Sequence, residues 1–169
     1  MTIIRTNRLA LRRATLDDAN FVLQLLNQPS FIDNIADKDV RTVESAHNYI
    51  QKAFLEPYTQ SAKAPYIVTL DDGTAIGVAG FYQRPTFNVP DLGYAFLDGF
   101  TGKGYATEAA IGLLEFARDK LALETVLAIT SPNNAPSAKL LQACGFSFQQ
   151  EVILDSSKEP ANLYRLDFE

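Results

Sequence analysis

Apolar residues recur along the chain at two spacings, one typical of amphipathic helices and the other of strands. Over 16–27 they follow the helical spacing, and Thr15 and Asp18 are placed to cap the helix start. A second helix is expected over 42–54, and it should end before Pro57 because proline disfavours helix in the residue before it. Between the two helices, mixed and acidic residues indicate a loop with at most one short helical turn.

Strand patterns fill most of the remaining chain, as alternating apolar and polar residues or as short apolar runs. The near-continuous apolar run TVLAIT is typical of a strand buried on both faces. The dipeptide Asp72-Gly73 marks a tight turn between two strands. Strands are therefore expected over 3–13 with a small break at Asn7, and over 65–70, 75–83, 91–98, 125–130, 146–154 and 161–168, the last two joined by a polar turn at 155–160.

Two more helices are expected in the second half of the chain. An alanine-rich apolar stripe predicts a long helix ending near Lys120, and residues 135–143 form a shorter one with Gly145 just past its end. Strands in succession, followed by alternating strands and helices, are typical of a mixed sheet covered by helices. We therefore expect one α/β domain over 1–169, with a mixed sheet of about seven strands and about four helices.

Composition narrows the classes of function. The chain has 169 residues, a hydrophobic fraction of 47% and a net charge of −5. Without Lys/Arg clusters, nucleic acid is a poor expectation as a partner, and an amine-bearing partner fits better. No apolar run reaches the roughly 18 residues that cross a membrane, and the first residues do not read as a signal peptide. With one cysteine and one histidine, neither a disulfide nor a His/Cys metal site is expected, and a cytoplasmic monomer or homodimer is the simplest expectation.

The stretch GFTGKGYATEAA, residues 99–110, places three glycines in six residues just before the long helix. No Ser, Asp or Asn stands at the helix start to cap it. A helix start without a side-chain cap leaves backbone N–H groups free and carries about half a positive charge, so it can hold an anion. The alternative is a tight strand-to-helix turn that binds nothing.

Two phosphate-binding motifs fail when they are tested against this stretch. Gly99 and Gly104 have the spacing of the P-loop, but Tyr105–Ala106 stands where that motif needs Lys and Ser or Thr. Gly102 and Gly104 fit the start of the dinucleotide pattern G-x-G-x-x-G, but Thr107 replaces the third glycine and no acidic residue ends the next strand. Neither a nucleoside triphosphate nor a dinucleotide is therefore indicated.

A third pattern fits the same residues. The stretch 101–106 resembles motif A of the GCN5-related N-acetyltransferases (GNAT), written Q/R-x-x-G-x-G/A, with Thr101 where that pattern has Gln or Arg. Within that family, GKGYATEA is similar to the subgroup typified by the ribosomal-protein N-terminal acetyltransferases RimJ and RimL. Further blocks resemble the subgroup in the same order: TNRLALRRATLDDA (6–19), DLGYAFLD (91–98) and NAPSAKLLQACGF (134–146).

This resemblance implies acetyl-coenzyme A as the donor, no metal, and a fold in which the fourth and fifth strands splay apart. In such a fold the pantetheine arm lies in the gap, and the pyrophosphate lies on backbone N–H groups of Gly102, Gly104 and Ala106. Lys103 adds a charge there, or else it is a solvated loop lysine. The residues that the resemblance implies in cofactor binding are Phe96 and Leu97 through their backbone, Thr101, Gly102, Lys103, Gly104, Tyr105, Ala106, Thr107, Asn134, Ser137 and Lys139.

Acetyl transfer to an amine calls for a group that takes the amine proton and one that protonates the leaving thiolate. Ser137 matches the Ser of the subgroup's N-x-x-S block and is the candidate acid, unless it satisfies backbone N–H groups at a helix start. Asp91 aligns with the Glu that often begins the subgroup's fourth strand, so it is the candidate for the base side, or else a turn residue. Tyr94 is expected in the core or in the wall of the cleft, and His47 on a solvated helix face.

The expected acceptor is a primary amine, and the subgroup implies a protein or peptide N-terminus that reacts directly in a ternary complex. The loop carboxylates Asp33, Asp37 and Asp39 either draw in a cationic amine or form a solvated acidic loop. A small amine such as a polyamine, amino acid or antibiotic is the alternative acceptor. A non-catalytic module that binds acyl-CoA is the alternative class of function.

Overall fold

A computed structural model of the protein describes residues 2–154 and 159–169, so residues 155–158 of the predicted final turn lie outside it. The strands are β1 (Thr2–Arg5), β2 (Leu9–Arg12), β3 (Pro65–Leu70), β4 (Ala75–Tyr82), β5 (Asp91–Phe96), β6 (Thr125–Thr130), β7 (Ser147–Ile153) and β8 (Pro160–Asp167). Over the described residues they form an eight-stranded sheet in the order β1-β2-β3-β4-β5-β6-β8-β7. Neighbouring strands are antiparallel except for the parallel pair β5 and β6, so the expected mixed α/β sheet is confirmed.

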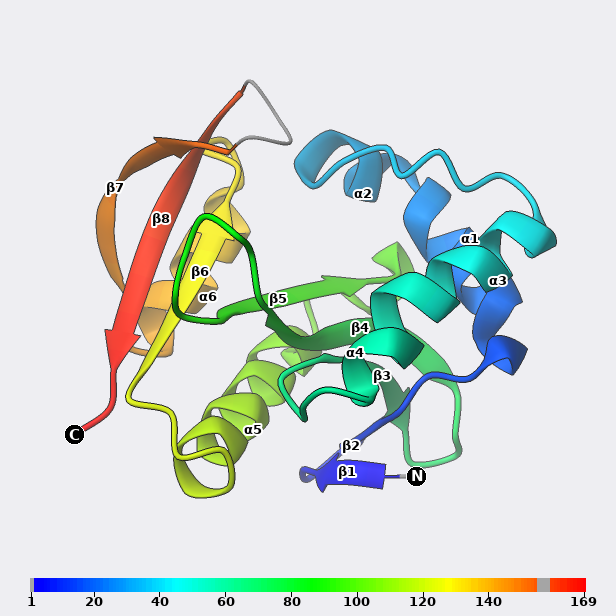
Figure 1. The fold of residues 1–169 in the computed structure, drawn as a ribbon, viewed down its shortest axis with the longest axis horizontal. Helices are drawn as coiled ribbons and strands as arrows, with labels where there is room; N and C mark the ends of the chain where they lie inside the picture. Colours follow the sequence, from blue (N-terminus) through cyan, green and yellow to red (C-terminus); the bar gives the residue numbers. More distant parts are fainter. Residues whose placement is uncertain (1, 155–158) are drawn as a thin grey trace.

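Helices cover both faces of this sheet (Figure 1). They are α1 (Ala19–Asn27), α2 (Pro29–Asn34), α3 (Val43–Ile50), α4 (Glu56–Tyr58), α5 (Tyr105–Asp119) and α6 (Ala135–Ala143). Along β3, Ile67 packs with α1 and α3, whereas Tyr66 and Val68 pack on the α5 face, because successive strand residues point to opposite faces. In Figure 1, β5 runs from the side of β6, β8 and α6 toward the side of α1–α3. No helix in the described ranges is long and apolar enough to span a bilayer.

The first predicted strand, over 3–13, is instead a hairpin of β1 and β2, which accounts for the eighth strand. The chain reverses at Asn7. The Thr6 N–H donates to the Leu9 carbonyl at 2.9 Å, and the Leu9 N–H donates to the Thr6 hydroxyl at 3.1 Å. Arg5 then pairs with Ala10 across the turn. The small break expected at Asn7 is therefore a full reversal of the chain.

The helix predicted over 42–54 starts as expected, because Thr42 and Ser45 each accept a backbone N–H from the other. The expectation that it ends before Pro57 is wrong. It continues from α3 through a π-helical segment, Gln51–Leu55, into α4, which contains Pro57. Proline has no N–H to donate to the preceding turn, and a wider π turn lets the helix pass such a residue.

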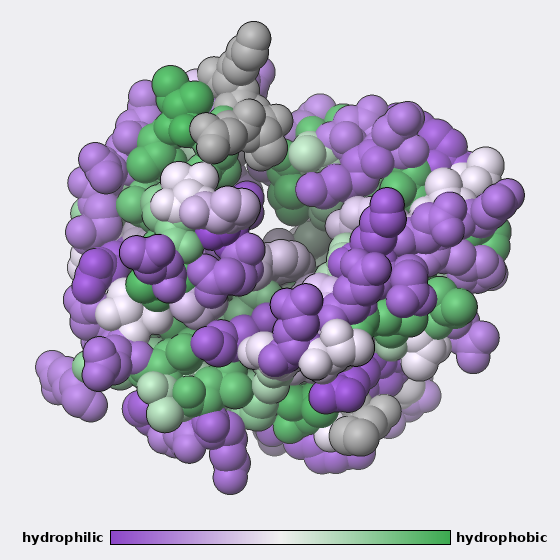
Figure 2. Space-filling model, in the orientation of Figure 1, coloured by the Kyte–Doolittle hydropathy of each residue, from purple (hydrophilic) through white to green (hydrophobic). Residues whose placement is uncertain are grey.

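Strands β5 and β6 separate soon after they meet. They pair only through Asp91 with Leu127 and through Leu92 with Ala128 in the described part of the chain. The predicted splay between these two strands is therefore confirmed. Figure 2 shows a hollow near the centre of this face of the molecule, and the opening beside the second half of β5 is where the candidate site lies.

Candidate active site

A cavity of about 1360 Å³ extends through the opening between β5 and β6. Both sides of the sheet contribute to it, with Val22 and Phe31 from α1 and α2, and Leu141 from α6. Neither Leu97 nor Lys103 lines it. The other residues predicted for the site all line this one cavity: Asp91, Phe96, Thr101, Gly102, Gly104, Tyr105, Ala106, Thr107, Asn134, Ser137 and Lys139.

The glycine-rich turn presents bare backbone N–H groups to the cavity. Gly102 has a φ of 75° and Gly104 a φ of 82°, a left-handed conformation that favours glycine. Gly104 is the N-cap of α5 and no side chain caps this helix. None of the N–H groups from Gly102 to Thr107 donates a hydrogen bond to another described residue. Both the left-handed turn and the macrodipole of α5 therefore favour an anion at this wall of the cavity.

Arg8, from the β1–β2 hairpin, contacts the glycine-rich turn and the first turn of α5. Its Nη1 donates to the Lys103 carbonyl at 3.0 Å, its Nε pairs with Glu108 at 2.7 Å, and its guanidinium lies 4.4 Å from the centre of the Tyr105 ring. Glu108 also accepts hydrogen bonds from the Thr6 hydroxyl and the Arg8 backbone N–H. These contacts fix the turn between the β1–β2 hairpin and the first turn of α5.

Backbone N–H and carbonyl groups along β5 differ in whether they already have a hydrogen-bond partner among the described residues. Leu97, expected to present a free backbone, donates its N–H to the Ile76 carbonyl of β4 at 2.9 Å and accepts the Phe100 N–H. The Phe96 carbonyl accepts the Gln28 side chain at 2.7 Å. Because alternate residues of an antiparallel ladder bond to the same neighbour, the N–H groups of Tyr94 and Phe96 point toward the gap.

One buried hydroxyl on the opposite wall of the gap has no hydrogen-bond partner among the residues that the structure describes. Thr130 ends β6, lines the cavity and is 8% exposed. Its Oγ1 makes no hydrogen bond within the described ranges. A buried hydroxyl without a partner is costly, so Thr130 is suited to meet a polar group of a bound ligand.

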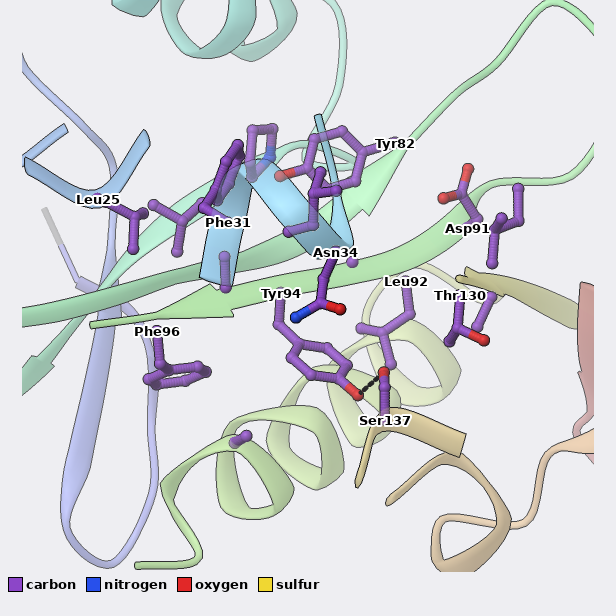
Figure 3. Close-up of a pocket in the computed structure, with 18 of the residues that line it drawn as sticks. Leu25, Phe31, Asn34, Tyr82, Asp91, Leu92, Tyr94, Phe96, Thr130 and Ser137 are labelled. Carbon is purple, nitrogen blue, oxygen red and sulfur yellow. Dashed lines mark hydrogen bonds between the residues drawn. The ribbon is translucent and has the colours of Figure 1, made fainter. Parts of the chain in front are cut away.

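Ser137 and Tyr94 form a hydroxyl pair in the cavity, with Ser137 Oγ 2.6 Å from Tyr94 Oη (Figure 3). Asn134, the N-cap of α6, accepts the backbone N–H of Ser137 at 3.3 Å. The helix start is thus capped by Asn134, and the Ser137 hydroxyl is left for Tyr94. Burial raises the pKa of Tyr94, so its phenol keeps its proton at neutral pH.

Asp91 lies at the start of β5 and is 2% exposed. Its two carboxylate oxygens share the one N–H of Arg84 Nε, at 3.2 and 3.4 Å. Burial raises its pKa to about 6, although Arg84 opposes that rise. Strand residues three apart point to opposite faces, and Figure 3 shows the Asp91 carboxylate directed away from the Tyr94–Ser137 pair. The two candidate catalytic groups therefore reach the cavity from opposite faces of the sheet.

The carboxylates of the acidic loop do not line this cavity, so the expectation that they draw in a cationic amine is not supported. Asp33, Asp37 and Asp39 are absent from the cavity wall. Asp37 instead pairs with Arg41 at 2.7 Å. The loop contributes a cation, Lys38, because that side chain turns to the cavity while the neighbouring carboxylates face solvent.

Comparisons with known proteins bear on this geometry. The model of the acetyltransferase (GNAT) domain matches residues 8–147. The uncharacterised N-acetyltransferase p20 of Bacillus licheniformis is 30% identical over 155 residues, which cover 91% of this chain and 86% of p20. RimL, a ribosomal L7/L12 α-N-protein acetyltransferase solved with coenzyme A, superposes with a TM-score of 0.85 at 16% identity over 99% of this chain and 98% of RimL. A chimera of the spermidine N-acetyltransferase SpeG from Vibrio cholerae superposes with a TM-score of 0.77 at 13% identity, over 94% and 95% of the two chains.

Proposed function

The chain belongs to the GNAT acetyltransferase family, and from this premise we propose that it transfers the acetyl group of acetyl-CoA to a primary amine. The residues 1–169 act as one such domain, by direct transfer with both substrates bound. The observation that carries the choice of donor is a set of N–H groups without partners among the described residues, on the wall residues Gly102 and 104–107. The acceptor that we favour is a protein or peptide N-terminus, since GKGYATEA and the block 134–146 resemble the ribosomal-protein subgroup.

The cavity fits the parts of acetyl-CoA one by one. The N–H groups of the glycine-rich turn would hold the pyrophosphate, with no metal needed because dipoles meet its charge. The gap beside β5 would hold the pantetheine arm, with the Tyr94 and Phe96 N–H groups on one wall and the unpartnered Thr130 hydroxyl on the other. Asn134, the N-cap of α6, and Lys139, within α6, also line the cavity. Bound there, acetyl-CoA would supply an activated acetyl thioester.

The side chains around the gap divide the work of acetyl transfer. Ser137 donates a proton toward the leaving sulfur, and Tyr94, at 2.6 Å, restores or orients that proton. A backbone N–H of β5 that faces the gap stabilises the oxyanion. Asp91, on the other face of the sheet, holds the acceptor amine and takes its proton, directly or through water. Holding the two substrates together supplies much of the acceleration.

A panel of acceptors tests the proposal. Release of the free CoA thiol is followed with acetyl-CoA and either peptides with N-terminal Ala or Ser or a set of small amines, polyamines included. Turnover of peptides supports the proposed acceptor, and turnover of small amines alone supports the alternative that the spermidine enzyme SpeG illustrates. Binding of acetyl-CoA without turnover of any amine contradicts the enzyme and favours an acyl-CoA-binding module. A cytoplasmic location and a monomeric or dimeric state stay predictions.

Asp91 gives a prediction for pH dependence. The ionised carboxylate is the form that holds and deprotonates the amine, and burial raises its pKa to about 6. We therefore expect kcat/KM to fall as the pH drops below about 6, where Asp91 gains a proton. Asp91→Asn should lower kcat/KM about 100-fold at neutral pH and abolish this acid limb. The measurement is a pH–rate profile. Asp98→Asn, which removes another cavity carboxylate, should keep the limb, and a limb that persists in Asp91→Asn excludes this role.

A further inference from the structure

The acceptor side of the cavity is the part of its wall that lies away from the glycine-rich turn and α6. This part carries more positive than negative charge. It includes the cations Lys38, Lys52, Lys63 and Arg84. The acids on the whole described wall are Asp91 and Asp98. Asp98 already accepts a hydrogen bond from Ser30 at 2.6 Å, and none of the three lysines has an ion-pair partner within the described residues.

Arg84 and Lys38 are two cations of this wall whose charges interact. Arg84 uses only its Nε, on Asp91, and its two Nη groups have no partner in the part of the chain that the structure describes. Burial lowers the pKa of Lys38, and the charge of Arg84 lowers it further, so the two cations on this wall repel each other. A pair of repelling cations with free donors is an arrangement that a bound anion would stabilise.

We propose that the acceptor carries an anionic group close to its primary amine, and that Lys38 and the free Nη groups of Arg84 bind this group. The inference rests on the proposed function, since it concerns the acceptor of the same reaction. Asp91 fixes the spacing. An anion on the Nη groups of Arg84 lies one guanidinium away from the Asp91 carboxylate, where the amine binds. The amine and the anion are therefore a few bonds apart, as in an amino acid or in a peptide whose first residues are acidic.

Neutral donors complete this side of the cavity. Tyr49 and Tyr82 line it. Their hydroxyls make no hydrogen bond within the described residues, and burial raises their pKa values. Both phenols therefore stay protonated and can donate to a carboxylate. Asn34 also lines the cavity, and its amide points toward Tyr94 in Figure 3. Cationic side chains outnumber carboxylates on the described wall, which matches an acceptor bearing a carboxylate.

The same charges disfavour polyamines. A polyamine brings several positive charges to a wall that already holds Lys38, Lys52, Lys63 and Arg84, with one available carboxylate to offset them. Nearby cations also lower the pKa of a bound amine, which raises the fraction of the neutral form that attacks. An acceptor with its own anion offsets the charge of these cations, so its binding is not opposed by that repulsion.

Matched acceptor pairs test the proposal. The pairs are peptides beginning Asp or Asn, peptides beginning Ser-Glu or Ser-Gln, and an amino acid or its amide. Each is assayed for turnover, and its binding to the enzyme–CoA complex is measured by calorimetry. We expect the anionic member of at least one pair to have a KM and a Kd about tenfold lower. The pair that responds distinguishes a side-chain carboxylate from an α-carboxylate.

Variants connect the preference to its residues. Lys38→Ala should reduce the anionic preference to about twofold, whereas Lys120→Ala, at the end of α5 and away from the cavity wall, should leave it intact. Turnover with no preference in any pair, or a preference that Lys38→Ala leaves unchanged, overturns this inference and leaves the acetyltransferase standing. If no amine is acetylated while calorimetry still favours the anionic members, the anion site stands and the proposed function fails.

Discussion

Replacing Gly102 by aspartate is expected to raise the Kd for acetyl-CoA at least about 100-fold, which corresponds to about 2.7 kcal/mol. A side chain at Gly102 enters open space beside the unpartnered N–H groups, with no heavy atom within 4 Å of its Cβ. A carboxylate there occupies the place of the pyrophosphate and repels it, and two unit charges 4 Å apart near a protein surface interact by about 4 kcal/mol. Gly102 is preferable to Gly104, whose Cβ would lie 3.3 Å from Arg8 Nη2, because Arg8 would neutralise part of the added charge.

Two controls separate charge from backbone strain. Gly102→Asn has nearly the same shape and tolerates the left-handed φ of 75°, so its Kd should rise far less than that of the aspartate variant. Gly99→Asp adds a carboxylate three residues earlier, outside the cavity wall, and should bind acetyl-CoA nearly as the wild type does. Calorimetry gives the affinities and circular dichroism confirms folding. Equal losses in the aspartate and asparagine variants would mean that the turn does not hold a phosphate.

Ser137→Ala is expected to lower kcat about 100-fold, because general acid catalysis typically contributes that much or more. The Kd for acetyl-CoA should change less than about fivefold, since one neutral hydrogen bond is worth about 1 kcal/mol. Asn134 caps α6 and the Ser137 hydroxyl bonds only to Tyr94 among the described residues, so the variant should keep its fold. Steady-state kinetics and calorimetry measure the two quantities separately.

Tyr94→Phe and Ser131→Ala complete this test. Tyr94→Phe removes the hydroxyl 2.6 Å from Ser137 and keeps the ring, so kcat should fall to a value between those of the wild type and Ser137→Ala. Ser131 also lines the cavity, and its removal should leave kcat within about twofold of the wild type. Parallel losses of kcat and acetyl-CoA affinity in Ser137→Ala would assign Ser137 to binding and remove it as the acid.

Local sequence patterns predicted the parts of the site that depend on local structure. The left-handed glycines at 102 and 104 and the uncapped helix start form as expected, and the strand predicted over 91–98 forms over Asp91–Phe96. Turn geometry and hydrophobic period are encoded within a few residues. The strand count was wrong at Asn7 for a related reason. A reversal of three residues inside an alternating pattern looks the same as a short break, and only the pairing of Arg5 with Ala10 distinguishes them.

The charged environment of the site could not be predicted in this way. Whether Asp91 is exposed or buried depends on how β5 packs, and its partner Arg84 lies in an irregular connection with no periodic signal. Lys38 lies between Asp37 and Asp39 in the sequence, yet it lines the cavity and they do not. Arg8 was not predicted as a site residue. It belongs to the block 6–19 that resembles the subgroup, and that resemblance was the one signal in the sequence that could have indicated its role. Such contacts arise from tertiary packing, which residue spacing does not encode.

The Arg8 contact makes the cofactor turn depend on the far end of the chain. Arg8 and the Lys103 carbonyl that it holds are 95 positions apart in the sequence. A ligand that tightens the turn must also tighten the β1–β2 hairpin, so the free energy of cofactor binding is shared with the docking of the first dozen residues. A polypeptide shortened at its amino end would retain every letter of the glycine motif and still lose affinity for the cofactor, which makes ligand affinity a gauge of whether the whole sheet has assembled.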